Sequence, residues 1–425
     1  MKTIIYSLVF AFTFVVIAAG ESLRLDPLVR QTQRAIPFCV TGAGGNSLDS
    51  TIAEIVRKDL SKHGAFIAAR ISSGDEKTLD SAERRKGKIY FKNWANLGAQ
   101  ILGKIKSQNG KVEFYLYTPY NGKRILAKRY RGSASSAERV GHLIADDIIQ
   151  AILHEKGFFS SRLLFVKGDI KSKNIYLANS DGSGMKALTK GKTLCIFPDW
   201  FPDGKNVLFT SYFEGRPIIY KMALANGKAK RLLAMPGMNV CGAVSPDGRK
   251  LAAILDKDGQ PELYVINLRS GKRKRLTHGR AVESSPSWSP DSKKIVYASD
   301  EAGGRPQIYT IPASGGKAHR LTTSSFSRYC TSPSWSPDGK KIAFVAQLAG
   351  NFDVCLYDVN SRQIYQLTTN PNNDEGPSWA CDSRHIAYSR VYGRKSQIML
   401  LDSETGKTSP LIHSGEYCGS PSWGP

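Results

Sequence analysis

A six-residue motif recurs along the C-terminal two-thirds of the chain at almost constant spacing. Its copies are DWFPDG at 199–204, AVSPDG at 243–248, SWSPDS at 287–292, SWSPDG at 334–339, SWACDS at 378–383 and the shortened SWGP at 422–425. The steps between the Trp-type positions are 44, 44, 47, 44 and 44 residues. Repeats of this length are typical of the four-stranded blades of a β-propeller. Six copies therefore predict a six-bladed propeller.

The two ends of the repeat region predict how the ring closes. Within a repeat, the Trp-type strand is followed by a Pro-Asp-Gly turn and then by three further strand-like runs. The first such run, Leu163–Val166, has no Trp-type strand before it, whereas the last Trp-type strand, Ser420–Trp423, has no runs after it. We expect Ser420–Trp423 to complete the first blade, because circular closure leaves no unpaired edge at the seam. The Trp-type strands should then be innermost and line the channel.

The residues before the repeats predict an export signal and a separate domain. Lys2, the apolar run Ile4–Ala19 and the small residue Gly20 match a secretory signal peptide, and about 16 apolar residues are too few to span a bilayer. We therefore expect a signal peptide at 1–20, an extended segment at 21–34, an α/β domain at 35–157 and the propeller at 158–425. The predicted fold is mixed, with a small N-terminal α/β domain followed by an all-β six-bladed propeller.

Secondary structure within the predicted α/β domain follows from hydrophobic periodicity. Strands are expected at 35–40, 66–71, 100–106, 112–118 and 124–131. Helical spacing of apolar residues predicts one helix over Ser47–His63. A second helix, which ends near Gly157, should begin with the capping pattern Ser135-x-x-Glu138.

Motifs that carry chemistry are missing from the sequence. It contains no G-x-S-x-G, no HExxH and no CxxC, and its seven histidines show no metal-ligand spacing. The glycines at 42–45 are interpreted as a strand-to-helix loop, and the repeated Asp of the Pro-Asp-Gly motif as a turn residue. We therefore expect no catalytic residues, no metal and no cofactor, and predict that the protein is not an enzyme.

Two other functions stay open. The formal net charge of +24 could serve a module that binds envelope polyanions, although the charge is spread along the chain. A propeller-containing periplasmic hydrolase is the second alternative. An exported chain would not meet nucleic acid, so we expect no nucleic-acid partner.

The cysteine positions give one further hypothesis. Cys195, Cys330 and Cys418 each lie five residues before the Trp-type position of their repeat, which places them at one height in the ring. Circular closure makes the blades of Cys195 and Cys418 neighbours. We expect these two to be the closest cysteine pair and hypothesise a disulfide between them.

The loops that lead into the innermost strands are candidates for a binding site. They vary while the strands behind them repeat, which is how a scaffold carries a specific site. The predicted partner-binding residues at this rim are Asp199, Met238, Asn239, Cys241, Glu283, Ser284, Tyr329, Asn373, Asp374 and Tyr417. Because they are interpreted as surface residues, substitutions of Asn239, Glu283 or Tyr329 should leave the melting temperature almost unchanged.

Motifs along the whole chain resemble those of a known family. They are IPF at 36–38, IAEIV at 52–56, VGHLIADDIIQAILHEKGFF at 140–159, PSWSPDGKKIAF at 333–344 and SPSW at 420–423. Together with the signal peptide, they resemble the TolB family, the periplasmic component of the Tol–Pal envelope system.

That resemblance implies a non-enzymatic, monomeric periplasmic adaptor without a cofactor. It implies binding of the lipoprotein Pal at the propeller mouth, maintenance of outer-membrane integrity and assistance to outer-membrane invagination during cell division. It also implies a contact with TolA through the extended segment, where the residues concerned would be Leu23, Arg24, Leu25 and Arg30.

Overall fold

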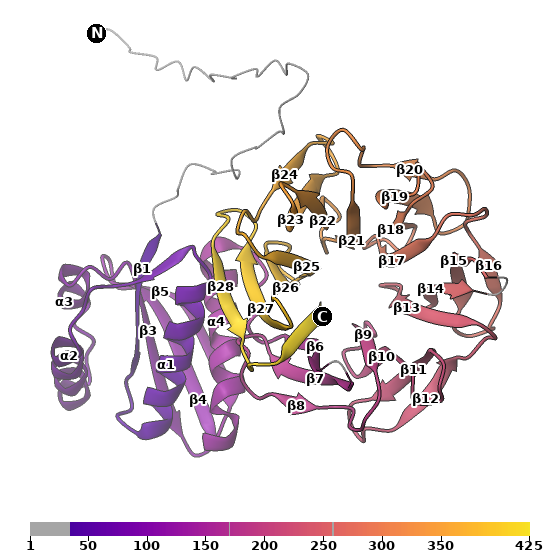
Figure 1. Ribbon diagram of the computed structural model, residues 1–425. Coiled ribbons are helices and arrows are strands. Elements are labelled where there is room, and N and C mark those ends of the chain that lie inside the picture. Colours follow the sequence, from indigo (N-terminus) through magenta and orange to yellow (C-terminus); the bar gives the residue numbers. More distant parts are fainter. Residues whose placement is uncertain (1–34, 170, 257–258) are drawn as a thin grey trace, which may run out of the picture.

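The computed structural model describes residues 35–169, 171–256 and 259–425, without the side chain of Cys241. A small α/β domain lies beside a ring of six four-stranded sheets, as predicted (Figure 1). The predicted signal peptide and extended segment, with Leu23, Arg24, Leu25 and Arg30, fall outside the described residues. No helix within the described residues is long and apolar enough to cross a membrane.

The α/β domain is built on one five-stranded sheet with the order β2-β1-β3-β4-β5. Its elements are β1 (Ile36–Gly42), α1 (Ser47–Lys62), β2 (Phe66–Ala68), α2 (Ser73–Lys86), α3 (Phe91–Asn96), β3 (Ile101–Gln108), β4 (Lys111–Thr118), β5 (Lys123–Arg131), a 3-10 turn (Ala134–Ser136) and α4 (Ala137–Leu153). β1 pairs in parallel with β2 and β3, and the other pairs are antiparallel. Apolar residues of α1 and α4, such as Ile52 and Ile144, pack on one face of the sheet.

Helices α2 and α3 cover the other face and were not predicted. The reason is visible in α2, whose buried residues are Asp80 and Glu83 rather than apolar ones. Both carboxylates contact the buried Lys104 ammonium of β3 at 2.7 Å, and Trp94 of α3 donates its indole N–H to Glu83 at 2.7 Å. A helix that buries ion pairs has no apolar stripe for a periodicity argument to detect.

The predicted capping pattern at α4 was wrong. The reciprocal cap joins Ser133 and Ser136 around the 3-10 turn, and Ser136, the N-cap of α4, makes no side-chain capping bond. Ser135, which was expected to cap the helix, lies inside the 3-10 turn instead.

Six sheets form the ring. They are blade 1 with β29 (Tyr417–Trp423), β6 (Arg162–Gly168), β7 (Lys173–Asn179) and β8 (Lys186–Ala187); blade 2 with β9 (Cys195–Trp200), β10 (Asn206–Ser211), β11 (Ile218–Ala223) and β12 (Ala229–Leu233); blade 3 with β13 (Met238–Val244), β14 (Lys250–Asp256), β15 (Pro261–Asn267) and β16 (Arg273–Arg275); blade 4 with β17 (Glu283–Trp288), β18 (Lys294–Ser299), β19 (Gln307–Pro312) and β20 (His319–Arg320); blade 5 with β21 (Cys330–Trp335), β22 (Lys341–Leu348), β23 (Asn351–Asp358) and β24 (Ile364–Gln366); and blade 6 with β25 (Asn373–Trp379), β26 (His385–Tyr392), β27 (Lys395–Asp402) and β28 (Thr408–Ile412).

Blade 1 confirms the predicted circular closure. The C-terminal strand β29 pairs antiparallel with β6, with Ser422 opposite Leu164 and Trp423 opposite Leu163. Figure 1 shows the yellow C-terminal strand completing the sheet that otherwise belongs to the start of the propeller. The repeated Asp residues are turn residues, as expected; Asp247, for example, accepts the backbone N–H of Arg249 at 3.0 Å.

The α/β domain and the propeller share a continuous apolar core. One cluster runs from Ile144 of α4 through Phe158 and Phe159 to Ala380 and Trp423 of blades 6 and 1. The degenerate SWACDS motif of blade 6 lies in this contact, where the Cys381 thiol meets the Gly157 carbonyl oxygen at 3.4 Å. Blade 6 thus departs from the repeat where it supports the other domain.

The hypothesised disulfide is wrong, because Cys195 and Cys418 are both free thiols. Each is buried and meets a hydroxyl instead. The Cys195 thiol lies 3.5 Å from the Ser211 hydroxyl, and the Cys418 thiol lies 3.0 Å from the Ser414 hydroxyl. Burial raises the pKa of Cys418, so this thiol is kept protonated and unreactive.

Truncation of Trp423 should test the closure of the ring. Its side chain is 7% exposed, packs edge-on against Phe158 at 5.5 Å and donates its indole N–H to the Ser161 hydroxyl at 2.6 Å. We expect Trp423→Ala to lower the free energy of unfolding by about 3–5 kcal/mol in urea denaturation. Phe213→Ala, at a side chain that is 79% exposed, is the control and should cost less than about 0.5 kcal/mol. Equal stabilities for the two variants would contradict closure through β29.

Candidate functional site: the propeller channel and its bulge face

The innermost strands enclose a central channel with a volume of about 610 Å³. As predicted, the Trp-type strands form its wall. Prolines line it at two levels, with Pro198, Pro286, Pro333, Pro377 and Pro421 at one and Pro202, Pro246, Pro290, Pro337 and Pro425 at the other. Each innermost strand is the edge of its sheet, so a residue without an N–H sacrifices no ladder hydrogen bond there.

A β-bulge interrupts the pairing of all six innermost strands. In five of them the residue three positions before the Trp-type position has a left-handed backbone, with φ of 52° at Phe197, 51° at Ser285, 52° at Ser332, 58° at Gly376 and 49° at Ser420. We call the end of the propeller at which these strands begin the bulge face, and the opposite end, with the Pro-Asp turns, the turn face. Bulges are frequent beside functional sites because they redirect side chains.

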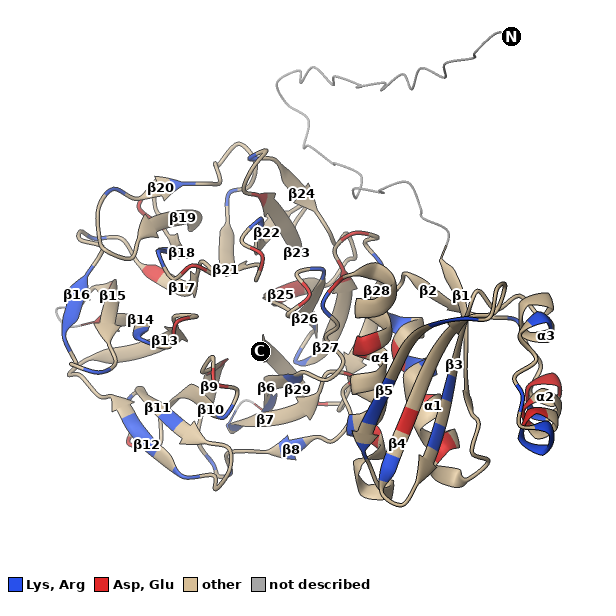
Figure 2. Ribbon diagram, turned by 180° about the vertical axis from the view of Figure 1, so that it is seen from behind, with Lys and Arg blue, Asp and Glu red and all other residues tan. Residues whose placement is uncertain are grey.

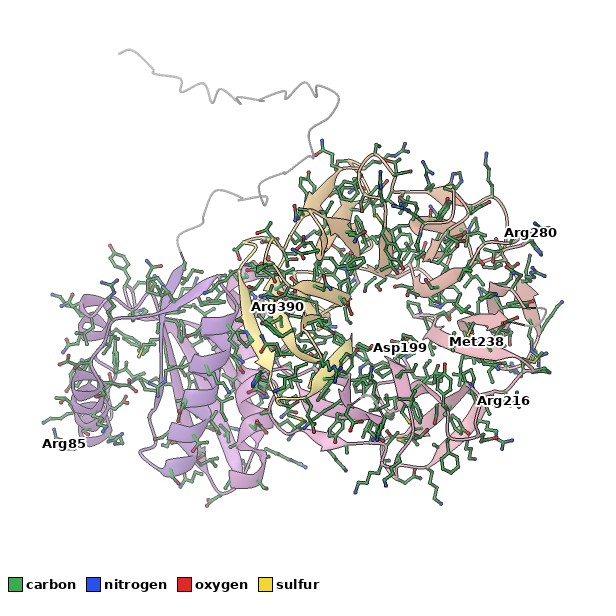
Figure 3. The ribbon with its side chains drawn as sticks, in the orientation of Figure 1. Arg85, Asp199, Arg216, Met238, Arg280 and Arg390 are labelled. Atoms are coloured by element: carbon green, nitrogen blue, oxygen red, sulfur yellow. The ribbon has the colours of Figure 1, made fainter. Side chains whose placement is uncertain are left out.

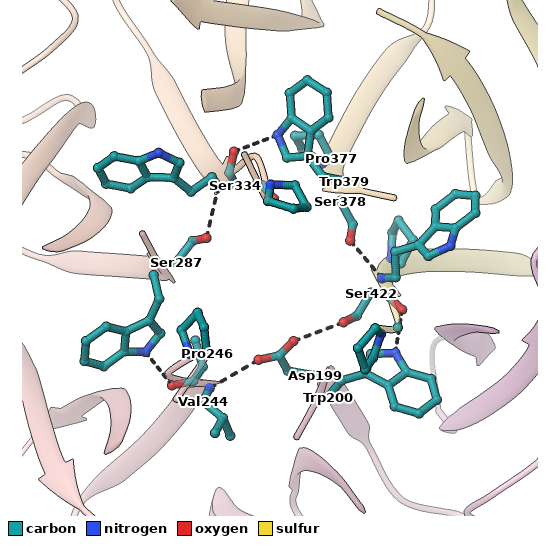
Figure 4. Close-up of a pocket in the computed structure, with 18 of the residues that line it drawn as sticks. Asp199, Trp200, Val244, Pro246, Ser287, Ser334, Pro377, Ser378, Trp379 and Ser422 are labelled. Carbon is teal, nitrogen blue, oxygen red and sulfur yellow. Dashed lines mark hydrogen bonds between the residues drawn. The ribbon is translucent and has the colours of Figure 1, made fainter. Parts of the chain in front are cut away.

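Hydrogen bonds of two alternating kinds join successive blades around the channel, and a further bond links Ser422 to Asp199 (Figure 4). At the start of blades 2, 4 and 6, the indole N–H groups of Trp200, Trp288 and Trp379 donate to the carbonyl oxygens of Ser422, Ala243 and Ser334 in the preceding blade at 2.9–3.0 Å. At blades 3, 5 and 1, the backbone N–H groups of Val244, Trp335 and Trp423 donate to the side chains of Asp199, Ser287 and Ser378 at 2.9–3.3 Å. The blades are therefore linked in a closed ring.

Asp199 was predicted on the rim, but it lies in the channel wall within this ring. It accepts hydrogen bonds from the Ser422 hydroxyl at 3.1 Å and from the Val244 N–H at 3.3 Å, and so connects blade 2 to both of its neighbours. Burial raises the pKa of its carboxyl to about 6. Asp199 therefore stabilises the contacts between blades, and it lies below the surface that a partner would contact.

Three other predicted residues lie on the bulge face but point inward. Asn239 is fully buried, and its amide donates to the carbonyl oxygens of Met235, Gly237 and Pro217. Asp374 is fully buried and receives two hydrogen bonds from the Arg390 guanidinium, at 2.8 and 3.0 Å. Glu283 is 5% exposed. The interpretation of Asn239 and Glu283 as surface residues is therefore wrong.

The remaining predicted residues are partly exposed on the bulge face. They are Met238, Ser284, Tyr329, Asn373 and Tyr417, whereas the side chain of Cys241 is not described. Tyr329 packs edge-on against Phe352 at 5.5 Å, and the Lys173 ammonium lies 3.8 Å from the ring centre of Tyr417. These side chains are available to a partner at the channel mouth.

Exposed apolar side chains add to this face, and two of them, Phe213 and Tyr392, come from regions farther out that the sequence analysis did not consider. Among the large apolar residues exposed in the described chain, four lie on the bulge face, with exposures of 39% at Phe197, 79% at Phe213, 47% at Val282 and 43% at Tyr392. Phe213 follows Ser211, which pairs with Cys195 at the start of β9, and Tyr392 ends β26 beside the start of β25. Apolar residues in short loops after strands were the signal that could have identified Phe213 and Tyr392.

Catalytic groups are sparse in the channel. Among the described residues that line it, Asp199 and Lys156 are the ones with ionisable side chains other than a cysteine, and none is His or Glu. One carboxylate that already accepts two hydrogen bonds offers no acid–base pair. Figure 3 places Asp199 at the channel, while Arg216 and Arg280 lie far out on the ring.

Comparison with known proteins identifies the family. The profile of the TolB beta propeller domain matches residues 149–425, and that of the TolB amino-terminal domain matches residues 27–125. The chain belongs to the TolB family.

Two curated relatives agree with this assignment. The Tol-Pal system protein TolB of Hahella chejuensis is 34% identical over 244 residues, which covers 54% of this chain and 55% of the relative. The protein of the same name from Geobacter sulfurreducens is 32% identical over 175 residues, or 40% of each chain. The chain therefore spans about half the length of the curated relatives it matches.

A solved TolB structure extends the likeness to both domains. TolB from Acinetobacter baumannii superposes with a TM-score of 0.79 at 25% identity, covering 92% of this TolB-family chain and 97% of the other. A nidogen/laminin complex superposes on 62% of the chain with a TM-score of 0.52 at 13% identity, which reflects the propeller fold alone.

The alternating ring can be tested with a matched pair of serines. Ser287 accepts the Trp335 N–H, whereas Ser334 contributes only its backbone carbonyl oxygen to the next blade. Ser287→Ala should lower the free energy of unfolding by about 1 kcal/mol because it removes the hydrogen bond between blades 4 and 5. Ser334→Ala should change it by less than about 0.5 kcal/mol. If urea denaturation showed a similar decrease in the free energy of unfolding for both variants, the alternation of the two kinds of bond would not contribute to stability.

Glu283 should make stability depend on pH. Burial raises the pKa of its carboxyl from 4.5 to about 8, with Glu262 adding to the shift. The folded state then binds a proton that the unfolded state releases above pH 4.5, so stability falls as the pH rises from about 5 to 8. Glu283→Gln should remove roughly 2–4 kcal/mol of this decline, whereas Glu301→Gln, at an exposed side chain, should keep it. Parallel curves for Glu283→Gln and the parent protein would refute this account.

Proposed function

We propose that this TolB-family chain is a non-enzymatic adaptor of the Tol-Pal system that acts in the periplasm and binds the lipoprotein Pal at the bulge face. The observation that carries the proposal is the group of exposed apolar side chains there, Phe197, Phe213, Val282 and Tyr392. Exposed apolar groups gathered on one face are typical of protein-binding surfaces, and aromatic side chains are frequent anchors at interfaces.

The partly exposed polar residues at the channel mouth fit such an interface. Tyr329, Asn373 and Tyr417 lie on or before innermost strands, closer to the channel than the loop that carries Phe213, so apolar anchors would sit beside groups that can form hydrogen bonds. Arg390 is fixed in place by its two hydrogen bonds with Asp374 and would present a rigid guanidinium. A monomer with this face open is the proposed binding form.

The alternatives find less support in the described residues. A hydrolase would need more ionisable groups than Asp199 and Lys156 at the channel. Figure 2 shows Lys and Arg together with Asp and Glu over both domains, which differs from the single basic face that a polyanion-binding module would use. Part of the basic strand β5 is neutralised, since Arg129 pairs with Glu113 and Lys128 with Asp147.

Roles in outer-membrane integrity and in invagination at division belong to the same proposal, as does a contact with TolA through residues 21–34. The printed names of the curated relatives support membership of the Tol-Pal system. Deletion of the gene should therefore cause leakage of periplasmic proteins and chaining of dividing cells, and a chain without residues 21–34 should keep Pal binding and lose TolA.

Binding of purified Pal should depend on the bulge face. Phe213→Ser and Tyr392→Ser should each weaken it more than about tenfold in isothermal titration calorimetry, which corresponds to about 1.4 kcal/mol. Tyr120→Ser, at a side chain of the α/β domain that is 95% exposed, is the matched control and should bind normally. Full affinity in both bulge-face variants would place the Pal site elsewhere.

A further inference from the structure

Two histidines from different domains meet in the interface between the α/β domain and blade 6. His63 caps the C-terminus of α1, and His385 is the first residue of β26. Their ring centres lie 5.2 Å apart, and their exposures are 1% and 0%. This pair could not be predicted from the sequence because no spacing rule connects residues so far apart in the chain.

The nitrogen atoms of this pair lack partners. Both ring nitrogens of His63 and the Nε2 atom of His385 make no hydrogen bond with any described residue. A buried polar atom without a partner costs about 1–3 kcal/mol, so three such nitrogens at one place call for a ligand. A cation accepts one lone pair from each imidazole, so it would satisfy one nitrogen of His63 and the Nε2 atom of His385.

Asp382 completes the cluster. Its Oδ2 atom lies 2.6 Å from Nδ1 of His385, and its Oδ1 atom accepts the backbone N–H groups of Arg384 and His385 at 3.0 Å. A carboxylate on one ring nitrogen orients the imidazole and leaves the other nitrogen for a metal, which is the usual support of metal-binding histidines. One donor atom each from His63, Asp382 and His385 lie within 4.8 Å of one another.

The cluster arises where blade 6 departs from the repeat. In blade 3 the Ser245 hydroxyl bonds to the turn residue Asp247, but blade 6 has Ala380 at the position of that serine. Asp382 therefore bonds to the His385 ring instead. Blade 2 lacks the serine as well. There Asn206, at the position that corresponds to His385, donates its side-chain amide to Asp203 at 2.6 Å. The Asn206 amide alone therefore provides the hydrogen bond to the turn carboxylate in blade 2. An imidazole at this position provides the same bond and also carries a second ring nitrogen.

Charge and access are compatible with a cation. Arg384 is paired with Asp402, at 2.8 Å, and with Glu404, at 3.4 Å. Together with Asp382, three carboxylates lie around the pair, and Arg384, Lys62 and Lys407 are the described cationic side chains near it, so the surrounding charges balance. A small cavity of about 100 Å³ beside His385, bounded by Gly64 and Asp402, gives a route from the surface.

We propose that His63 and His385 bind a divalent transition metal ion, with Asp382 holding the His385 ring in place and zinc as the ion that suits the pair best. The two imidazoles supply two of the four ligands of a tetrahedral zinc ion, at about 2.0–2.1 Å, and water molecules supply the others. The donor atoms would move closer together on binding. Because the ligands come from both domains, the ion fastens the α/β domain to blade 6.

Metal binding by the purified full-length protein tests the proposal directly. After treatment with a chelator, the protein should take up one equivalent of zinc in isothermal titration calorimetry, and its melting temperature should rise as zinc is added. With cobalt as the probe, visible absorption of a four-coordinate site should appear and be displaced by zinc. A protein that takes up neither ion would overturn the proposal, whatever the variants do.

Variants locate the site. His385→Asn copies Asn206 of blade 2, so it should fold, and it should weaken zinc binding by about tenfold or more; His63→Gln should do the same. His319→Asn, at an exposed ring, and Glu138→Gln, in the separate group of Glu138, His142 and Asp181, should bind as the parent does. Unchanged zinc affinity in His385→Asn, or a loss confined to Glu138→Gln, would overturn the assignment.

Discussion

The ring of inter-blade hydrogen bonds around the channel is the constraint on which the propeller depends. Its two kinds of bond alternate, so blades 2, 4 and 6 supply an indole N–H and an acceptor side chain, while blades 1, 3 and 5 contribute backbone groups to these bonds. This explains why blade 3 can carry Ala243 and Val244 in place of Ser and Trp. It also explains why the C-terminal strand is indispensable, since Ser422 and Trp423 provide the bonds on both sides of blade 1.

The ring of hydrogen bonds and the contact with the α/β domain together explain where the repeat changes. The departures of blade 3 fall where the ring needs no side chain, and those of blade 6 fall where the α/β domain docks. Ala380 is fully buried in the shared core, and replacement of the turn serine at this position frees Asp382 for His385. The departure in blade 6 therefore marks the blade that contacts the α/β domain.

The sequence predicted the architecture because blade number, closure and the channel wall follow from spacing alone. It failed where burial does not follow hydrophobicity, as in α2, which buries Asp80 and Glu83 against Lys104. It also failed to tell which side chains at the rim face outward. Alternation along a strand assigns faces only while the pairing is regular, and the bulge in each innermost strand breaks that alternation. Asn239, Glu283 and Asp374 were for this reason assigned to the surface although they are buried.

The two faces of the propeller differ in what they contact. On the turn face, Lys156 and Cys381 border the channel together with the C-terminal Pro425, so the end of the α/β domain reaches that side. The channel itself is committed to the ring, because Asp199, Ser287 and Ser378 already accept hydrogen bonds. The side chains that stay available are those on loops of the bulge face, which support neither the ring nor the domain interface. Phe213 or Tyr392 can therefore change without disturbing the ring or the domain interface. A repeated fold in this way lets a binding surface vary independently of the scaffold that carries it.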